Sequence, residues 1–320
     1  MSLLCINKLN AGYLTNDGYI QIVNNVSFAV NKGEMLGIAG ESGSGKTTLV
    51  SAILNALKYP GAINSGSVNF NGEDILKMSK EKLRTIRGIK ISYVPQGSMD
   101  SLNPVKKIRD QFYDIIFSHD INISKNKLDS VLNIVNLESN VLDLYPHQIS
   151  GGMKQRVIIA MSLLYNPDLI VMDEPTTGLD VLVQYEIVKT IKDIQNRLNL
   201  SIIFITHDIA LLFEIADRTM VFYGGEILEL GNYNLILSDP KHPYTKLLLG
   251  SIPTITKSVD KLYSIPGKPI DFIKRPVGCV FSPRCSYANE ECFVKHPDLR
   301  ELDGIYFRCL RYPEWKNIKL

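Results

Sequence analysis

Residues 40–47 read Gly-Glu-Ser-Gly-Ser-Gly-Lys-Thr and match the pattern G-x-x-x-x-G-K-[ST] without a mismatch. The apolar run 34–39 before them predicts a strand, and residues 46–57 after them predict a helix. A glycine-rich loop in this context turns its backbone N–H groups toward phosphates, and the helix N-terminus adds a partial positive charge. The stretch, called the phosphate loop below, therefore predicts a nucleotide site in an α/β fold.

The polar residues of the phosphate loop have distinct expected roles. The Lys46 ammonium group places a positive charge on the β- and γ-phosphates, and the Thr47 hydroxyl can bind Mg²⁺. A chance glycine- and serine-rich loop is the alternative, and the agreement of motif and context argues against it. The residues expected to contact nucleotide here are Gly40, Ser42, Gly43, Ser44, Gly45, Lys46, Thr47 and Thr48.

A second element joins an apolar strand to two carboxylates. Residues 169–174 read Leu-Ile-Val-Met-Asp-Glu. A carboxylate at the exit of a central strand can hold Mg²⁺ through water, and we assign that role to Asp173. Glu174 points elsewhere and can polarise an attacking water as a general base. The alternative is a pair of solvated acids at the start of a loop.

A second glycine-rich element, Ser150-Gly151-Gly152, opens a predicted helix that runs to residue 165. Its hydroxyl, its N–H groups and the helix dipole could bind an anion. Because the phosphate loop already holds a nucleotide in this chain, the second element makes best sense if it reaches another chain's γ-phosphate. The alternative is a simple helix N-cap by Ser150.

Apolar periodicity sets the organisation of the chain. Strand patterns lie at 20–30, 67–70, 90–94, 169–172 and 201–206, and a helical pattern covers 181–198. The last two strands are almost wholly apolar, which suits the centre of a parallel sheet. Residues 104–145 show helical periodicity and predict an inserted helical subdomain. Residues 220–230 predict a hairpin through Gly224 and Gly225, and repeated prolines after residue 232 indicate a small irregular module.

Composition excludes several classes of protein. The 320 residues are 45% hydrophobic and 21% charged with a net charge of +2, which is the profile of a globular chain. The near-neutral charge argues against a protein that coats nucleic acid. The sequence has neither an uninterrupted apolar run of about 18 residues, long enough to span a membrane, nor a signal-peptide pattern. We therefore expect the chain to stay in the cytosol.

The order of motifs resembles an ABC-type ATPase. It runs from the phosphate loop (Walker A) through Gln96, the Ser-Gly-Gly element and the 169–174 strand (Walker B) to Asp180 and His207. The resemblance implies a P-loop core with an antiparallel β subdomain over residues 1–235, with a helical subdomain at about 104–149. In that family two cassettes sandwich two ATP molecules head to tail, so Ser150, Gly151 and Gly152 would contact the γ-phosphate on the opposite cassette.

The resemblance also implies roles for single residues. Gln96 would sense Mg²⁺ and the attacking water, Asp180 would lie in the loop crossing the dimer interface, and His207 would contact the γ-phosphate. Tyr13 would stack on adenine. The alternatives are a loop amide for Gln96, a helix-capping histidine for His207 and strand packing for Tyr13.

Two departures from the family pattern occur. Met153 follows Ser-Gly-Gly where glutamine is common, and Gly178 precedes Leu-Asp where alanine is frequent. The first is typical of peptide-permease ATPases. The second makes the interface loop more flexible.

Further strings resemble the ATPase subunits of oligopeptide and dipeptide permeases. They are residues 98–104, 174–181, 242–245, 265–267 and 275–279. The resemblance implies a subunit on the cytoplasmic face of the membrane that works with an external binding protein, two membrane subunits and a second ATPase subunit, either a related chain or a second copy. The solute would be a peptide, nickel or an oligosaccharide. A soluble non-transport ABC ATPase and a nucleotide-regulated iron–sulfur protein are the rival interpretations.

Four cysteines are concentrated in the C-terminal extension, residues 236–320. Cys279, Cys285, Cys292 and Cys309 fall within 31 residues, and Cys5 stands apart. Four thiolates suit tetrahedral Zn²⁺ or an iron–sulfur cluster. The spacing lacks paired C-x₂-C knuckles, and the permease resemblance implies a [4Fe–4S] cluster. Zinc and unliganded thiols remain alternatives.

Overall fold

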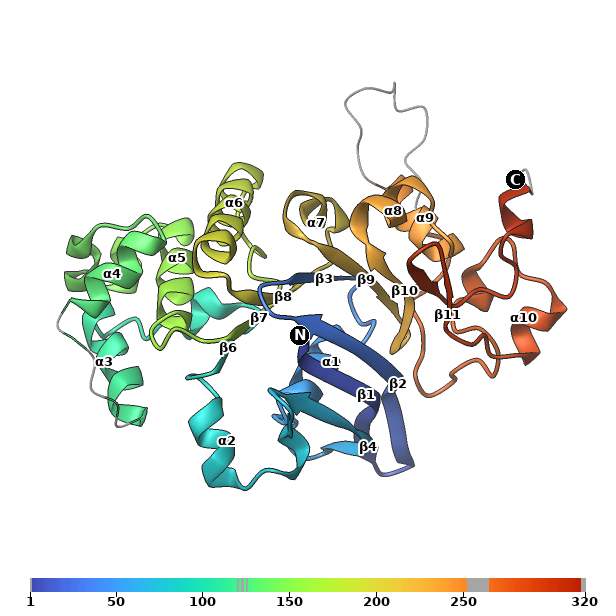
Figure 1. The fold of residues 1–320 in the computed structure, drawn as a ribbon, viewed down its shortest axis with the longest axis horizontal. Helices are drawn as coiled ribbons and strands as arrows, with labels where there is room; N and C mark the ends of the chain where they lie inside the picture. Colours follow the sequence, from blue (N-terminus) through green and yellow to red (C-terminus); the bar gives the residue numbers. More distant parts are fainter. Residues whose placement is uncertain (1, 120, 122–123, 125, 252–264, 318–320) are drawn as a thin grey trace. The chain divides into compact units, whose positions relative to one another are not determined.

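The computed structural model describes residues 2–119, 121, 124, 126–251 and 265–317 (Figure 1). The chain divides into two compact units. The helical unit comprises Asn31–Met35 and Lys77–Ile205. The loop unit comprises Ser2–Val30, Leu36–Leu76 and the residues from Thr206 onward.

A small parallel sheet forms the base of the helical unit. Strands β6 (Ile91–Val94), β7 (Leu169–Asp173) and β8 (Ser201–Thr206) lie side by side in the order β8-β7-β6, with Leu169 opposite Ser201 and Ile91 opposite Leu169. Every residue of β7 and β8 is buried. The apolar runs 169–172 and 201–206 therefore form the parallel strands that they predict.

Helices make up the rest of the helical unit, and α4 packs on α5 (Figure 1). The α-helices are α2 (Lys80–Ile86), α3 (Ile108–His119), α4 (Lys127–Ile134), α5 (Gly151–Ser162) and α6 (Val181–Leu198). Short 3-10 turns are η2 (Ser98–Ser101), η3 (Ser139–Asp143) and η4 (Pro146–Gln148). The helical pattern expected between residues 104 and 145 is confirmed over its described residues.

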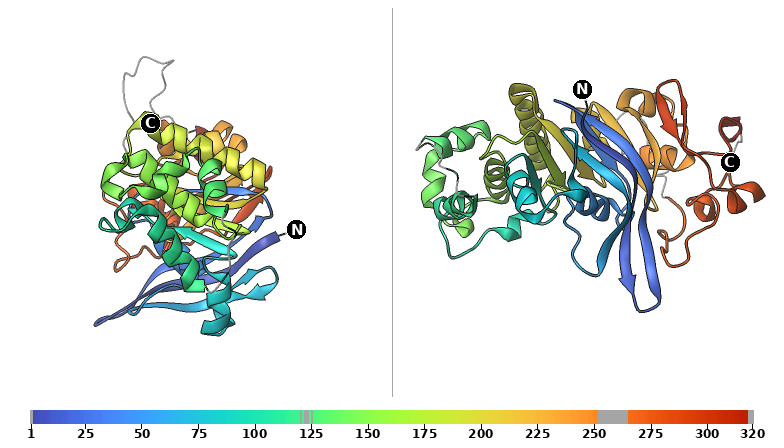
Figure 2. Two further views of the ribbon diagram at one scale, coloured as in Figure 1. Left: turned by 90° about the vertical axis from the view of Figure 1, so that its left-hand side faces the viewer. Right: turned by 60° about the horizontal axis from the view of Figure 1, so that its bottom comes forward.

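The loop unit contains an antiparallel sheet of long strands (Figure 2, right). Its order is β2-β1-β4-β5, with β1 (Ser2–Thr15), β2 (Gly18–Asn31), β4 (Gly61–Phe70) and β5 (Glu73–Asp74). Strand β1 pairs with β4 from Leu4 opposite Phe70 to Tyr13 opposite Gly61. The alternation at 20–30 predicts β2, whereas β1 is not predicted.

A second sheet of the loop unit follows the order β11-β12-β10-β9-β3. Strand β3 (Met35–Ala39) runs parallel to β9 (Arg218–Tyr223), and β9 forms the expected hairpin with β10 (Glu226–Asn232). Helices α1 (Lys46–Ile53), α7 (Ile209–Ile215), α8 (Tyr233–Ser238) and α9 (Pro243–Gly250) belong to this unit, together with the 3-10 turn η1 (Ile75–Lys77).

The C-terminal extension is more regular than the sequence predicts. Its hairpin of β11 (Arg300–Leu302) and β12 (Ile305–Phe307) pairs with β10 and so widens the sheet. Helix α10 (Glu290–Val294) and the 3-10 turns η5 (Ser282–Arg284) and η6 (Glu314–Asn317) complete it. Buried Phe307 and Trp315 pack with Tyr287 and Cys309 in a core of their own.

Candidate nucleotide site

The phosphate loop joins the buried strand β3 to helix α1. Gly43 and Gly45 have φ of 77° and 101°, a region that favours glycine. A Cβ at Gly40 would lie 2.1 Å from the Phe222 carbonyl oxygen, so only glycine fits there. Sterics therefore explain all three glycines of the phosphate loop, Gly40, Gly43 and Gly45.

The side chain of Lys46 folds back onto the phosphate loop. Its side chain is buried, and Nζ donates to the carbonyl oxygens of Gly40 at 2.7 Å and Glu41 at 2.9 Å. The ammonium group is thus held over the loop backbone, while Ser42 and Thr47 are exposed. Phosphate contact by Lys46 and Mg²⁺ binding by Thr47 stay predictions.

The β9–β10 turn is hydrogen-bonded to the backbone of the phosphate loop. The Gly225 N–H donates to the Ser44 carbonyl oxygen at 2.9 Å, and the Gly225 carbonyl accepts from the Asn24 N–H at 2.9 Å. A Cβ at Gly225 would lie 1.7 Å from the Ile22 carbonyl oxygen. The loop, the turn and β2 are therefore in backbone contact.

Tyr13 stands beside the first turn of α1. Its Oη lies 3.4 Å from Thr48 Oγ1, and its side chain is partly buried on β1. The structure thus brings two of the predicted nucleotide contacts together. Stacking of Tyr13 on adenine stays a prediction.

In the helical unit, Asp173 ends β7 and is fully buried. Tyr93 Oη approaches Asp173 Oδ2 at 3.5 Å. Burial, followed by the charge of Asp173, raises the pKa of Tyr93. A neutral phenol therefore faces a carboxylate at the position predicted to hold Mg²⁺ through water.

Glu174, indicated by the strand that it follows, and Gln96, indicated by the family resemblance, lie together. Gln96 Nε2 donates to Glu174 Oε2 at 3.4 Å, and Thr177 Oγ1 donates to the same oxygen at 3.1 Å. The Glu174 N–H donates to the Ile205 carbonyl at 2.9 Å. Its φ of 49° is uncommon for a residue other than glycine and recurs at functional sites.

The Ser-Gly-Gly element begins α5. Ser150 is its N-cap, and Ser150 Oγ accepts from the Met153 N–H at 3.2 Å, so the capping interpretation is confirmed. This bond leaves the anion-binding role untested. A Cβ on Gly151 would lie 3.2 Å from Leu179 Cδ2, and one on Gly152 would lie 2.8 Å from Val183 Cγ1. The element therefore packs against the loop that leads into α6 and against the first turn of that helix.

Asp180 is the N-cap of α6, because its Oδ1 accepts from the Val183 N–H at 3.1 Å. The next two side chains, Val181 and Leu182, are about four-fifths exposed at 80% and 79%. Gly178 has a φ of 83°, a conformation that alanine rarely adopts, so the departure from the family pattern matches the backbone. Capping and exposure suit an interface loop.

His207 is exposed after β8. The capping alternative for His207 is wrong, because Asp208 is the N-cap of α7 and its Oδ1 accepts from the Ala210 N–H at 2.9 Å. The histidine ring is thus not needed to start the helix. Its contact with the γ-phosphate stays a prediction.

The four cysteines of the extension line one small cavity of about 20 Å³, the space of about one water. Burial, with a contribution from the neighbouring thiols, raises the pKa of Cys279 and Cys309 to about 12 and that of Cys285 to about 11. Among the described residues, no group of three or more His, Cys, Asp or Glu side chains is arranged to hold a metal ion. This arrangement therefore selects neither zinc nor an iron–sulfur cluster.

Two contacts to the phosphate loop escape prediction from the sequence. Glu41 contacts Tyr244 and Arg284, which follow it by 203 and 243 residues. The pattern G-x-x-x-x-G-K-[ST] leaves position 41 open, so no signal marks it.

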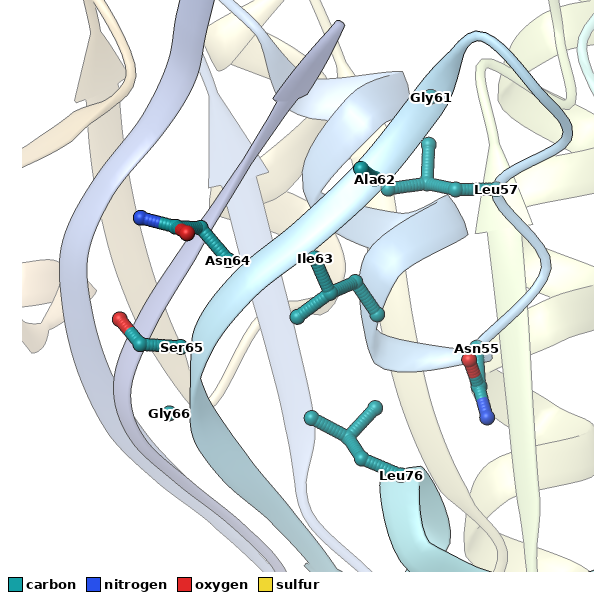
Figure 3. A pocket seen from close by; sticks show the side chains of 9 residues that line it. All are labelled: Asn55, Leu57, Gly61, Ala62, Ile63, Asn64, Ser65, Gly66 and Leu76. Carbon is teal, nitrogen blue, oxygen red and sulfur yellow. The ribbon is translucent and has the colours of Figure 1, made fainter. Parts of the chain in front are cut away.

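A separate pocket of about 460 Å³ lies along β4 (Figure 3). Its lining is formed by Asn55, Leu57, Gly61, Ala62, Ile63, Asn64, Ser65, Gly66 and Leu76. It contains no ionisable side chain and none of the predicted site residues, so it suggests no chemistry.

Two family models match the chain. The model described as "ABC transporter" matches residues 23–177, and "Oligopeptide/dipeptide transporter, C-terminal region" matches residues 228–292. Among solved structures, a dimeric ATP-binding cassette in a post-hydrolysis state with ADP and phosphate is 26% identical. It covers 72% of this chain and 98% of its own, with a TM-score of 0.63.

Similar proteins extend over nearly the whole chain. The dipeptide transport ATP-binding protein DppD of Caldanaerobacter subterraneus subsp. tengcongensis is 39% identical and covers 99% of both chains. DppD of Escherichia coli is 36% identical over 98% of this chain and 97% of its own. The oligopeptide transport ATP-binding protein OppD of Bacillus subtilis is 38% identical over 95% and 87%.

The fold and these matches define an ABC ATPase, an enzyme whose hydrolysis of ATP drives transport. Within that class, the chain belongs to the oligopeptide/dipeptide family of ABC transporter ATP-binding proteins. No helix in the described part of the chain is both long and apolar enough to cross a membrane.

Proposed function

We propose that this ATPase is the subunit that powers a binding-protein-dependent importer of peptides. The observation that carries the proposal is the match over the C-terminal region, because residues 228–292 resemble a region particular to oligopeptide and dipeptide transporters. The names of the similar proteins support the same solute class. The partners would be an external binding protein, two membrane subunits and a second ATPase subunit, with this chain on the cytoplasmic face.

Most of the predicted residues have a part in the proposed cycle. Lys46 and the loop N–H groups bind the phosphates of ATP, Tyr13 stacks on adenine, and the Ser-Gly-Gly element of the partner cassette closes on the γ-phosphate. Thr47 would bind Mg²⁺ through its hydroxyl, and Asp173 is the carboxylate that would bind Mg²⁺ through water; the bound ion would neutralise phosphate charge. The proximity of Gln96 to Glu174, at 3.4 Å, supports an arrangement in which Glu174 takes a proton from the attacking water while Gln96 orients it.

We place the ABC domain at residues 1–235 and the extension at 236–320. The pairing of β12 with β10 joins the two regions through a sheet, so the extension is not a separately tethered module. ATP binding would close the dimer of cassettes and hydrolysis would reopen it. The helical subdomain near Gln96 would pass this motion to a membrane subunit.

The test is uptake of a labelled dipeptide and tripeptide into vesicles containing the whole transporter. We expect ATP-dependent uptake, abolished by Lys46→Ala because the loop no longer holds the phosphates. Uptake of nickel or an oligosaccharide in place of peptide would reject the solute assignment. ATP hydrolysis by vesicles without uptake of any of these solutes would also reject it.

For the extension, we propose that Cys279, Cys285, Cys292 and Cys309 bind a [4Fe–4S] cluster. The support is the donor set, because four thiols face one cavity and thiolates are the ligands of such clusters. Since the cavity has a volume of about 20 Å³, the thiols must move outward to admit the cluster. Bound there, the cluster would fasten the segments that carry the cysteines.

The measurement is metal and labile sulfide content after anaerobic purification. We expect about four irons per chain, lost in Cys285→Ser and retained in Cys5→Ser, since Cys5 lies on β1. One zinc per chain would select zinc instead. Four rapidly alkylated thiols without metal in the anaerobic protein would reject both.

A further inference from the structure

Glu41, the second residue of the phosphate loop, forms an ion pair with Arg284 from the cysteine-containing segment. Arg284 Nη1 lies 2.5 Å from Glu41 Oε2, and Nη2 lies 3.0 Å from Oε1. Two parallel bonds of this kind fix both the position and the plane of the carboxylate. Arg284 is only 7% exposed, so water screens the pair weakly.

The guanidinium group is itself held in one orientation. Its Nε donates to the Pro266 carbonyl at 2.6 Å, and Nη1 also contacts Tyr223 Oη at 3.3 Å. Its carbon lies 5.6 Å from the centre of the Tyr223 ring and 5.9 Å from that of Phe281. Because these partners fix Arg284, the Glu41 carboxylate has one favoured position.

The backbone of Glu41 connects the ion pair with Arg284 to Lys46. The Glu41 N–H donates to Tyr244 Oη at 2.9 Å, and the Glu41 carbonyl accepts from Lys46 Nζ at 2.9 Å. Tyr244 is fully buried on α9. Two side chains of the extension therefore hold the residue whose carbonyl holds the phosphate-binding lysine.

Backbone hydrogen bonds beside the cysteine cavity hold the segment that carries Arg284. The turn η5 lies between Cys279 and Cys285, which both line the cavity. The Ser282 N–H donates to the Cys279 carbonyl at 2.9 Å, and the Cys285 N–H donates to the Ser282 carbonyl at 3.2 Å. Any disordering of this short loop would withdraw Arg284 from Glu41.

We propose that Arg284 is a positioning residue for nucleotide binding, which couples the order of the segment 279–285 to the affinity of the phosphate loop. It acts through Glu41 and touches no nucleotide. The proposal rests on the ATP-binding role of the loop. Without Arg284 the loop spends less time in its binding conformation, and the apparent affinity falls in proportion to the competent fraction.

The test is the dissociation constant for Mg·ATP and for ADP, measured on full-length protein by titration. We expect Arg284→Ala to weaken binding of both nucleotides about tenfold, which corresponds to a competent fraction of about one tenth. Arg284→Lys keeps the charge without the fork and should recover only part of the loss. Glu41→Gln should weaken binding similarly, and adding Arg284→Ala to it should change little, because both variants break one contact.

Arg275 provides a matched control in the same extension. It pairs with the buried Glu226 at 2.5 Å, and Glu226 keeps His296 and Asn24 as partners when Arg275 is removed. We expect Arg275→Ala to lower the unfolding temperature while nucleotide affinity stays within about twofold, since no loop residue loses its partner. An equal loss of affinity in Arg275→Ala would overturn the proposal, as would additive effects of the Arg284 and Glu41 changes.

Two further outcomes are distinguishable. If Arg284→Ala does not fold, the Arg284→Lys and Glu41→Gln variants decide the question by the same cycle. If the unaltered protein binds neither nucleotide, the role of the phosphate loop fails. If it binds both and Arg284→Lys and Glu41→Gln bind as tightly, only the coupling proposal fails.

Discussion

Glu174 combines a left-handed backbone with two side-chain partners on one carboxylate oxygen. Such a conformation costs of order 1–3 kcal/mol and persists only where surrounding contacts over-determine it. The bond from its N–H to the Ile205 carbonyl is one such contact. The backbone therefore fixes the direction of the side chain, as the proposed role of Glu174 as a general base requires.

Glu174→Gln should slow ATP hydrolysis by about 10²–10⁴-fold, because the amide keeps the shape of the side chain but cannot accept the proton. Nucleotide affinity should stay unchanged. The measurement is phosphate release by the assembled transporter beside nucleotide titration. Glu186→Gln, the same change at an exposed position of α6, is the control and should hydrolyse normally. A wild-type rate in Glu174→Gln would exclude Glu174 as the base.

Because His242 is buried, we predict that acid lowers the stability of the extension. It caps α9 by accepting the Tyr244 N–H on Nδ1 at 3.0 Å, and burial lowers its pKa to about 3. A depressed folded-state pKa means stability that is present above about pH 6.5 and is lost as the pH falls toward 3. His242→Asn keeps a capping side chain and removes this titration.

Between about pH 6.5 and 5, the free energy of unfolding of the unaltered protein should fall by about 2 kcal/mol more than that of His242→Asn. Glu229 acts in the opposite direction, because burial raises its pKa to about 7 and acid then favours the folded state. The contribution of Glu229 is the same in the unaltered protein and in His242→Asn, so it cancels when the two are compared. Parallel pH profiles from urea denaturation would contradict the prediction.

At the scale of elements, a substitution in the β9–β10 turn can test how closely this turn packs under the phosphate loop. Gly225 and Gly72 both have positive φ, 78° and 86°. A Cβ would lie 1.7 Å from the Ile22 carbonyl at Gly225 and would have no heavy atom within 4 Å at Gly72. The two alanine variants share the backbone strain and differ in the steric clash.

Gly225→Ala should therefore lower the free energy of unfolding by about 3 kcal/mol more than Gly72→Ala. Urea denaturation of both full-length variants gives the difference. Nucleotide binding should weaken only in Gly225→Ala, because the Gly225 N–H donates to the Ser44 carbonyl. Equal destabilisation would mean that the Ile22 carbonyl moves aside at little cost.

The elements also show how far the sequence predicts the fold. Strands β7 and β8 and helix α6 have the expected bounds to within one residue, because their patterns are long or wholly apolar. Helix α1 ends at Ile53 rather than 57, since Asn55 has a φ of 49°. The β11–β12 hairpin is missed because three-residue strands carry little periodicity and are set by pairing with β10.

The candidate site shows the same contrast between local patterns, which the sequence reveals, and long-range contacts, which it does not. Local motifs indicate the phosphate loop and Glu174, and the family resemblance indicates Gln96. These signals do not reveal the contact between Arg284 and Glu41, since 243 residues separate them and neither belongs to a motif. Long-range pairs of this kind follow from tertiary packing, which a single sequence does not reveal.

At the scale of the whole molecule, we propose that the chain acts as one of two ATPase subunits in a transporter. The solved cassette named above is a dimer bound to ADP and phosphate. Exposed Val181 and Leu182 directly follow Asp180, which the family resemblance places in the loop that crosses the dimer interface. The Ser-Gly-Gly element would then serve the nucleotide of the opposite cassette.

Gly151→Asp tests this sharing of sites. The new carboxylate would stand at the start of α5 and repel the partner's γ-phosphate, whereas an acidic residue in a first helical turn favours the helix itself. We expect ATP turnover by the assembled transporter to fall at least about 100-fold, the effect of misplaced transition-state charge. ATP affinity of the isolated subunit should stay unchanged.

Gly151→Asn is the matched control, because it adds the same bulk beside Leu179 without the charge. It should retain more turnover than Gly151→Asp, with the same affinity in the isolated subunit. Nucleotide titration of the monomer and phosphate release by the complex are measured on the same preparations. Weaker binding in the isolated Gly151→Asp subunit would show that the element serves its own phosphate loop, and the head-to-tail arrangement would then be wrong.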